Sequence, residues 1–209
     1  MIYLNNYGWN DKLSQLKQES TYNALTHGRI SIVHRTCYEV VSENGLFQCE
    51  LTGNMMYGKS DIELPCTGDW VLFQPFDEHK GIIVDMLPRE RTLYRKKNGT
   101  VADKQAIASY VDKAFIVQSL DDNFNVRRAE RFMVQMQEEN INPVLVFNKA
   151  DLGFDEQKVE EQIRHIARQI PVFFTSIHQP QTILQLRESI SAGETVVFVG
   201  SSGVGKSSL

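Results

Sequence analysis

Hydrophobic and polar residues alternate differently in the two halves of the chain. Between residues 28 and 88, short apolar runs recur between turn-forming residues, which is typical of a small all-β domain. The runs lie at residues 30–33, 38–41, 46–51, 70–73 and 82–87. Asn44-Gly45, between the second and third runs, is a strong hairpin signal because both residues tolerate positive φ. Five strands favour an OB-fold barrel, with an SH3-like barrel or a small sandwich as alternatives.

From residue 110 onward, apolar strands alternate with amphipathic helices. Strands are expected at residues 114–120, 143–147, 172–175 and 196–199. Between them, apolar residues recur at helical spacing, namely Ala129, Phe132, Met133 and Met136, then Val159, Ile163, Ile166 and Ile170, then Ile183, Leu186 and Ile190. Strands that are apolar along their length and alternate with helices predict a parallel sheet covered on both faces. This half is therefore expected to be α/β.

These patterns predict a mixed architecture with four parts. Residues 1–27 form an N-terminal extension in which Trp9, Leu13 and Leu16 are spaced as on a helix. Residues 28–88 form the barrel, residues 89–109 a basic linker, and residues 110–209 the α/β domain. The stretch 89–104 has a net charge of about +4, from Arg89, Arg91, Arg95, Lys96, Lys97 and Lys104 against Glu90 and Asp103. A solvated connector and an RNA-binding segment are both compatible with this charge.

Composition excludes several classes of protein. The 209 residues are 42% hydrophobic and 23% charged, which excludes a wholly disordered chain. No apolar run reaches the ~20 residues of a membrane-spanning helix, and the first residues lack the basic start and apolar core of a signal peptide. Cys37, Cys49 and Cys66 form no close pair, which favours reduced thiols over disulfides or a zinc site. We expect a cytoplasmic monomer without a membrane partner.

The last predicted strand runs into a phosphate-binding loop. Residues 200–207 read Gly-Ser-Ser-Gly-Val-Gly-Lys-Ser, which matches G-x-x-x-x-G-K-S. The glycines let consecutive backbone N–H groups point at one anion, and Lys206 supplies a mobile cation. The Ser207 hydroxyl is a hard oxygen ligand suited to Mg²⁺. The predicted phosphate-binding residues are Gly200, Ser201, Ser202, Gly203, Val204, Gly205, Lys206, Ser207 and Ser208.

The strand at 143–147 ends in Asn148-Lys149-Ala150-Asp151, which matches N-K-x-D. A carboxylate at Asp151 can accept two hydrogen bonds from guanine, whereas adenine has no such donor pair and would leave the carboxylate unpaired. The Lys149 stem can lie over the base. The alternative is a helix N-cap at Asp151. Ser176 and Ile177 follow the strand at 172–175, where a backbone N–H could reach the base oxygen. N-K-x-D lies at the carboxyl end of a strand, where nucleotides bind in open parallel sheets. Because this motif and the phosphate loop lie on one predicted sheet, guanine nucleotides, GTP and GDP, are the preferred ligands.

The order of the two motifs is unusual. In Ras-like GTPases the phosphate loop comes first, whereas here Asn148 precedes Gly200 by 52 residues. This order predicts a circular permutation, which a compact domain tolerates when its termini lie close together. By correspondence with a Ras-like sheet, the strands would lie in the spatial order 196–199, 114–120, 143–147 and 172–175. The phosphate-loop strand 196–199 would then lie at an edge.

The combination of barrel, basic linker, N-K-A-D and G-S-S-G-V-G-K-S resembles the ribosome small-subunit-dependent GTPase A family. Further matching stretches are Tyr7-Gly8-Trp9-Asn10, Gly28-Arg29-Ile30, His34-Arg35, Gly68-Asp69-Trp70-Val71, Leu87-Pro88-Arg89, Arg95-Lys96-Lys97, Val111-Asp112 and Asp122-Asn123-Phe124-Asn125. The resemblance implies an OB-fold followed by a circularly permuted GTPase domain. It also implies GTP hydrolysis, stimulated by the small ribosomal subunit, in late maturation of that subunit. Arg95, Lys96 and Lys97 become the candidate rRNA-binding residues.

The family continues beyond its phosphate loop with switch segments, a D-x-P-G motif and a zinc-binding domain of Cys and His residues. The chain ends at Leu209, so we expect a truncated form in which Zn²⁺ has no site and hydrolysis is in question. An rRNA-binding module with an inert nucleotide domain is the competing hypothesis. A third, an ATP-dependent P-loop protein, is disfavoured by Asp151.

Overall fold

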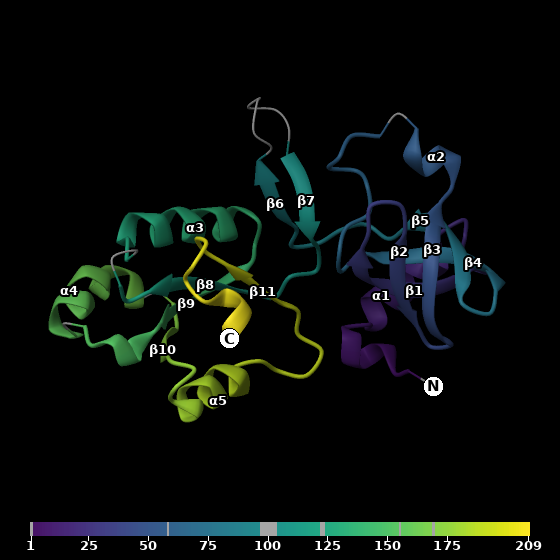
Figure 1. The fold of residues 1–209 in the computed structure, drawn as a ribbon. Helices are drawn as coiled ribbons and strands as arrows, with labels where there is room; N and C mark the ends of the chain where they lie inside the picture. Colours follow the sequence, from purple (N-terminus) through teal and green to yellow (C-terminus); the bar gives the residue numbers. More distant parts are fainter. Residues whose placement is uncertain (1, 58, 97–103, 122–123, 155, 169) are drawn as a thin grey trace. The chain divides into compact units, whose positions relative to one another are not determined.

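The computed structural model describes all residues except 1, 58, 97–103, 122–123, 155 and 169. Two compact units, Met1–Val111 and Asp112–Leu209, are present (Figure 1). Among the described residues, no helix combines the length and the apolar character needed to cross a bilayer.

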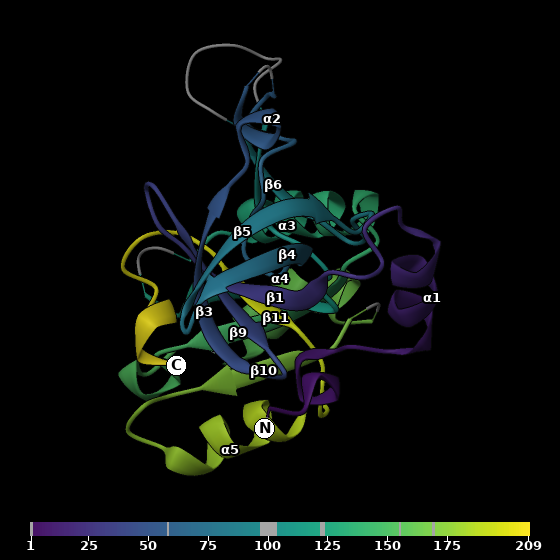
Figure 2. The same ribbon diagram turned by 90° about the vertical axis from the view of Figure 1, so that its right-hand side faces the viewer.

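The first unit contains a closed five-stranded barrel (Figures 1 and 2). Its strands are β1 (Thr26–Val33), β2 (Tyr38–Ser42), β3 (Gly45–Leu51), β4 (Trp70–Asp77) and β5 (Lys80–Met86), in the order β1-β2-β3-β5-β4. β3 and β5 are parallel, and the other pairs are antiparallel. All five predicted strands are confirmed, and the closed barrel is OB-like. Cys49 and Cys66 are buried free thiols, and burial raises the pKa of each to about 12.

The N-terminal extension packs on one side of the barrel. It contains η1 (Leu4–Tyr7) and α1 (Asp11–Glu19), and Asn10 caps α1 by accepting a 3.1 Å hydrogen bond from the Leu13 N–H. Leu4 and Leu13 are buried in one apolar cluster with Trp70. The amphipathic pattern therefore predicted the helix correctly. A short helix, α2 (Gly53–Met56), follows β3.

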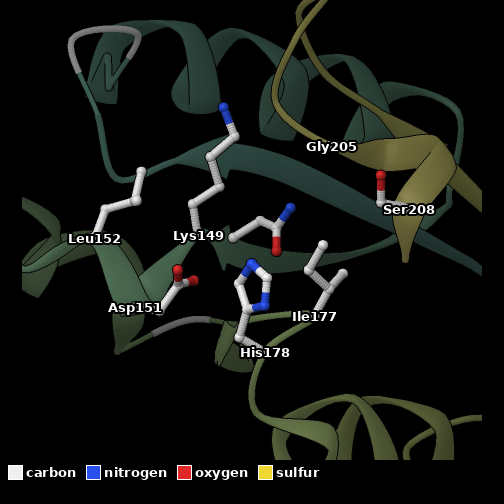
Figure 3. A pocket seen from close by; sticks show the side chains of 8 residues that line it. Lys149, Asp151, Leu152, Ile177, His178, Gly205 and Ser208 are labelled. Atoms are coloured by element: carbon white, nitrogen blue, oxygen red, sulfur yellow. The ribbon is translucent and has the colours of Figure 1, made fainter.

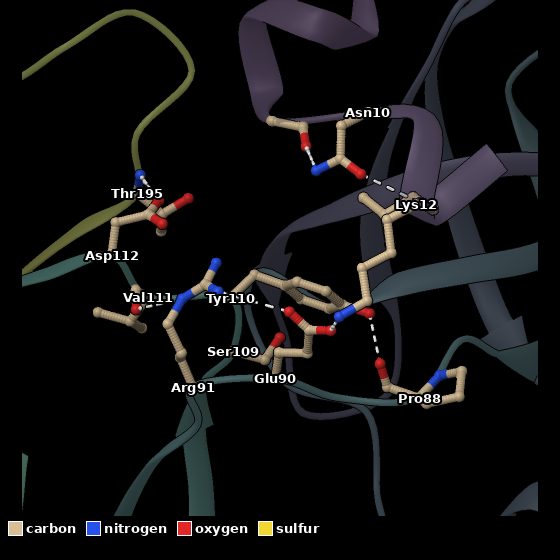
Figure 4. A network of polar contacts seen from close by, with 12 residues as sticks. Asn10, Lys12, Pro88, Glu90, Arg91, Ser109, Tyr110, Val111, Asp112 and Thr195 are labelled. Atoms are coloured by element: carbon tan, nitrogen blue, oxygen red, sulfur yellow. Dashed lines mark hydrogen bonds and ion pairs between the residues drawn. The ribbon is translucent and has the colours of Figure 1, made fainter. Parts of the chain in front are cut away.

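The residues expected as a basic linker include a hairpin that the sequence analysis did not predict. β6 (Leu93–Lys96) pairs antiparallel with β7 (Lys104–Ala108). The segments that precede β6 and follow β7 are joined by hydrogen bonds at the base of the hairpin (Figure 4). The Tyr110 hydroxyl donates to the Pro88 carbonyl at 2.6 Å, and the Arg91 Nε donates to the Val111 carbonyl at 3.1 Å. The described residues of the predicted linker therefore form a hydrogen-bonded hairpin and its base rather than a loose connector.

The second unit is a parallel sheet with helices on both faces (Figure 1). Its elements are β8 (Lys113–Ser119), α3 (Val126–Glu138), β9 (Asn142–Asn148), η2 (Ala150–Leu152), α4 (Glu156–Ala167), β10 (Val172–Thr175), α5 (Pro180–Glu188), β11 (Val196–Val199) and η3 (Lys206–Ser208). The strand order is β10-β9-β8-β11, with every pair parallel. This is the predicted order, and β11 lies at an edge of the described sheet.

Apolar side chains from alternate positions of the strands fill two cores. Ile116 and Phe147 pack toward the helices α3 and α4, while Phe115 and Val117 pack on the opposite face with Leu186 of α5. The start of β8 is fixed to the turn before β11, because the Thr195 N–H donates to Asp112 Oδ2 at 2.8 Å (Figure 4). Because all four strands are parallel, their carboxyl ends lie at one edge of the sheet.

Candidate nucleotide-binding site

A pocket of about 210 Å³ lies at the carboxyl ends of the strands (Figure 3). Asn148 ends β9, and Gly205 belongs to the loop that follows β11. The lining residues are Asn148, Lys149, Asp151, Leu152, Ile177, His178, Gly205 and Ser208. The structure thus brings the N-K-x-D segment, Ile177 and the phosphate loop to one cavity. Leu152 and His178 are additions that the sequence analysis did not assign to the site.

Asn148 joins three parts of this site. Its side chain is buried, and its Nδ2 donates to the Val204 carbonyl of the phosphate loop at 3.0 Å. Its Oδ1 accepts a 3.2 Å hydrogen bond from Thr175 Oγ1 at the end of β10. A Cβ at Gly205 would lie 2.3 Å from Asn148 Nδ2, and Gly205 has a φ of +91°. Only glycine therefore fits against Asn148 at this position.

Asp151 presents an ionised carboxylate to the pocket. Its Oδ1 accepts a hydrogen bond from the Ser176 hydroxyl. That bond, with a smaller contribution from nearby His178, holds the pKa of the Asp151 carboxyl below its ordinary value. Figure 3 shows the Asp151 carboxylate beside the His178 ring. The side chain is exposed and ionised, as an acceptor of two N–H groups must be.

Ser176 contributes through its hydroxyl rather than through its N–H. From the sequence, a backbone N–H of this loop is expected to reach the base. In the structure the Ser176 N–H donates to Thr182 Oγ1 at 3.0 Å, and the Ser176 Oγ accepts from the His178 N–H at 3.0 Å. Thr182 lies in the first turn of α5, six residues along the chain, so this interaction depends on the fold of the β10–α5 connection. Ser176 is completely buried and orients Asp151.

The side chain of Lys149 reaches Asp121, two residues after the end of β8. The Lys149 backbone is left-handed, with a φ of +61°. The Lys149 Nζ lies 2.9 Å from Asp121 Oδ2, and Asp121 Oδ1 accepts a 2.6 Å hydrogen bond from Ser119 Oγ. Neither Ser119 nor Asp121 was predicted to belong to the site. Their position at the carboxyl end of an apolar strand was the available signal, since Ser119 ends β8 and Asp121 lies two residues further on.

Side chains of the phosphate loop itself and the neighbouring strand β8 fix the conformation of the loop. Val204 is fully buried in the core beside Val117, so it contributes packing and a backbone carbonyl. A Cβ at Gly200 would lie 2.3 Å from the Val117 carbonyl, which requires glycine there as well. Lys206 Nζ donates to the carbonyls of Gly200 at 3.0 Å and Ser201 at 2.6 Å. The Lys206 side chain therefore lies across the loop in which it is expected to bind phosphate.

The remaining predicted phosphate-binding residues lie around this loop. Ser202, Gly203 and Ser207 are exposed. Gly200 and Ser201 line a second cavity, of about 330 Å³, with Arg128, Arg131, Phe132 and Gln135 of α3. None of these α3 residues was predicted to belong to the site.

The donor set fits magnesium bound to a nucleotide. Among the described residues, no cluster of three or more His, Cys, Asp or Glu side chains could hold a metal ion alone. Mg²⁺ is commonly held by one or two protein oxygens together with substrate phosphates and water. The exposed Ser207 hydroxyl beside Lys206 could be that protein oxygen.

The candidate RNA-binding residues belong to the first unit. Arg95 is exposed on β6, and Lys96 ends this strand. Lys97 lies outside the described residues. On the same hairpin, Lys104 Nζ lies 5.7 Å from the centre of the Tyr94 ring.

A model of the RsgA GTPase family matches residues 86–209. The chain belongs to this family. It is 74% identical over 203 residues to "Small ribosomal subunit biogenesis GTPase RsgA 1" of Bacteroides thetaiotaomicron, covering 97% of the chain and 57% of that protein. It is 35% identical over 205 residues to the RsgA of Methanosarcina acetivorans, covering 97% of the chain and 54% of that protein. The chain thus spans little more than half the length of these curated relatives.

Two solved structures have a fold similar to that of this chain. YjeQ from Thermotoga maritima has a TM-score of 0.68 at 26% identity, covering 88% of the chain and 63% of YjeQ. YloQ, described as a circularly permuted GTPase, has a TM-score of 0.63 at 24% identity, covering 91% of the chain and 64% of YloQ. The likeness to YloQ concerns the fold. The predicted fold class, an OB-like barrel followed by a circularly permuted GTPase domain, is confirmed.

Proposed function

We propose that this chain is the guanine-nucleotide-binding portion of a GTPase that acts in biogenesis of the small ribosomal subunit. The observation that carries the proposal is the ionised Asp151 carboxylate, oriented by Ser176, in the same pocket as Gly205 and Ser208 of the phosphate loop. A carboxylate in this position favours guanine over adenine. The phosphate loop supplies the anion site, with Ser207 as the candidate Mg²⁺ ligand.

In the complete protein, GTP hydrolysis is proposed to be stimulated by the small subunit. The exposed Arg95 on the β6–β7 hairpin supports an rRNA contact, and the names of the relatives support the subunit as the partner. We further propose that the protein is a cytoplasmic monomer and that any Zn²⁺ is held outside residues 1–209.

Two measurements on the full-length protein test this proposal. In a competition assay, unlabelled GDP should displace labelled GDP at far lower concentration than ADP does, and equal displacement would contradict guanine recognition. Co-sedimentation with small subunits should increase when a non-hydrolysable GTP analogue replaces GDP. Sedimentation that is independent of nucleotide would instead favour an rRNA-binding module with an inert nucleotide domain.

A further inference from the structure

Asp121 connects the end of β8 to the base pocket. One of its carboxylate oxygens accepts the 2.6 Å hydrogen bond from Ser119 Oγ, and the other lies 2.9 Å from the Lys149 Nζ. Ser119, the last residue of β8, thus orients Asp121, which in turn orients the side chain of Lys149 directly after β9. Lys149 lines the pocket, whereas Asp121 does not.

The backbones that carry this ion pair are also joined. The Leu120 N–H donates to the Asn148 carbonyl at 3.0 Å, directly before Asp121 in one segment and before Lys149 in the other. Lys149 has a left-handed backbone and precedes η2. With both backbones placed, the ion pair sets the direction of the Lys149 alkyl chain. Without a partner for its ammonium group, a lysine chain samples many rotamers.

We propose that Asp121 is a positioning residue for the nucleotide, an inference that rests on the proposed function. It holds the Lys149 stem as one wall of the pocket, where the four-carbon chain packs against the flat face of a guanine base. Lysine commonly covers apolar surface with its stem in this way while its ammonium group reaches a polar partner. Asp151 reads the edge of the base, and Lys149, directed by Asp121, covers its face.

This role can be separated from a role in folding. The Lys149 and Asp121 side chains are 34% and 28% exposed, and ion pairs this exposed contribute little to stability. Replacing Asp121 should therefore change nucleotide affinity while leaving the melting temperature of the nucleotide-free protein nearly unchanged.

The test is a double-mutant cycle on the full-length protein, with GDP affinity measured by calorimetry. Asp121→Asn should weaken GDP binding roughly tenfold, because the long lysine side chain must then be ordered on binding. Lys149→Met keeps an unbranched stem but removes the ammonium group, so Asp121→Asn should have no further effect in that background. Glu130→Gln is the control, since it also replaces a carboxylate with an amide, at a 2.7 Å hydrogen bond to His165 Nε2 that lies outside the pocket lining. This control should leave GDP affinity unchanged.

Two results would overturn the inference while the proposed function stands. One is unchanged GDP affinity in Asp121→Asn. The other is an equal loss of affinity from Asp121→Asn in the parent and in the Lys149→Met background, which would show that Asp121 acts independently of Lys149. A parent protein that binds no GDP would instead overturn the proposed function, and this inference with it.

Discussion

Gly205→Ala tests how the phosphate loop and the base-binding segment are joined. The new Cβ would lie 2.3 Å from Asn148 Nδ2, at a residue with a φ of +91°. The left-handed backbone alone costs an alanine about 1–2 kcal/mol. Because Asn148 must move, its hydrogen bonds to the Val204 carbonyl and from Thr175 Oγ1 are also broken. At about 1 kcal/mol for each bond, the total cost is about 3–4 kcal/mol.

Gly153→Ala is the matched control for the cost of the left-handed backbone. Gly153 has a φ of +74°, but a Cβ there would meet nothing within 4 Å. Its replacement should therefore cost only the strain of the left-handed backbone, which leaves Gly205→Ala about 2 kcal/mol more destabilising.

Hydrogen exchange in the full-length protein measures this difference locally. The Leu120 amide is the natural probe because it donates to the Asn148 carbonyl. Its protection should fall about 30-fold further in Gly205→Ala than in Gly153→Ala, since 1.36 kcal/mol corresponds to a factor of ten. GDP affinity should fall only in Gly205→Ala. Equal protection of Leu120 in the two variants would refute the close approach of Gly205 to Asn148.

Two further predictions concern the first unit. Replacing Arg95, Lys96 and Lys97 with Gln should weaken binding to small subunits and reduce its salt dependence, by roughly 0.7–0.9 in the log–log slope for each phosphate that is no longer neutralised. Arg168→Gln, at an exposed position of the second unit, is the control, and an unchanged slope would make the basic stretch a solvated surface only. Burial and, to a lesser extent, the charge of Lys17 lower the pKa of His27, whose ring lies 4.1 Å from that of Trp9. The contribution of neutral His27 to the free energy of unfolding should therefore be fully present above pH 6.5 and be lost as the pH drops through the lowered pKa. His27→Gln should remove that part of the pH dependence of the melting temperature. An unaltered pH profile would contradict the claim that protonation of His27 destabilises the fold.

Sequence patterns predicted the elements well because each depends on local periodicity. The barrel strands, α1 and the parallel strands were all identified, and the order β10-β9-β8-β11 followed from the permuted motifs. The β6–β7 hairpin was missed because its basic residues were interpreted as a charged connector rather than as the polar face of two short strands.

The candidate site was predicted less completely, since several of its interactions join residues that are distant in sequence. Asn148, Lys149 and Asp151 were found from their motif. In contrast, Asp121 becomes a partner of Lys149 only when β8 and β9 lie side by side. The interaction of Thr182 with the Ser176 N–H likewise depends on the turn from β10 into α5. Such polar interactions follow from tertiary structure and leave no periodic signal.

The central claim is that Asp151 recognises guanine. It is tested most directly by replacing Asp151 and comparing nucleotides with different bases. In the full-length protein, Asp151→Asn replaces an acceptor with a donor, which suits the acceptor that xanthine carries in place of the guanine amino group. Affinities for GDP and xanthosine diphosphate should be measured for the parent and the variant. We predict that GDP binds more tightly to the parent and that the preference shifts toward xanthosine diphosphate in Asp151→Asn. A variant that binds GDP as tightly as its parent does, with no gain for xanthosine diphosphate, would contradict the account.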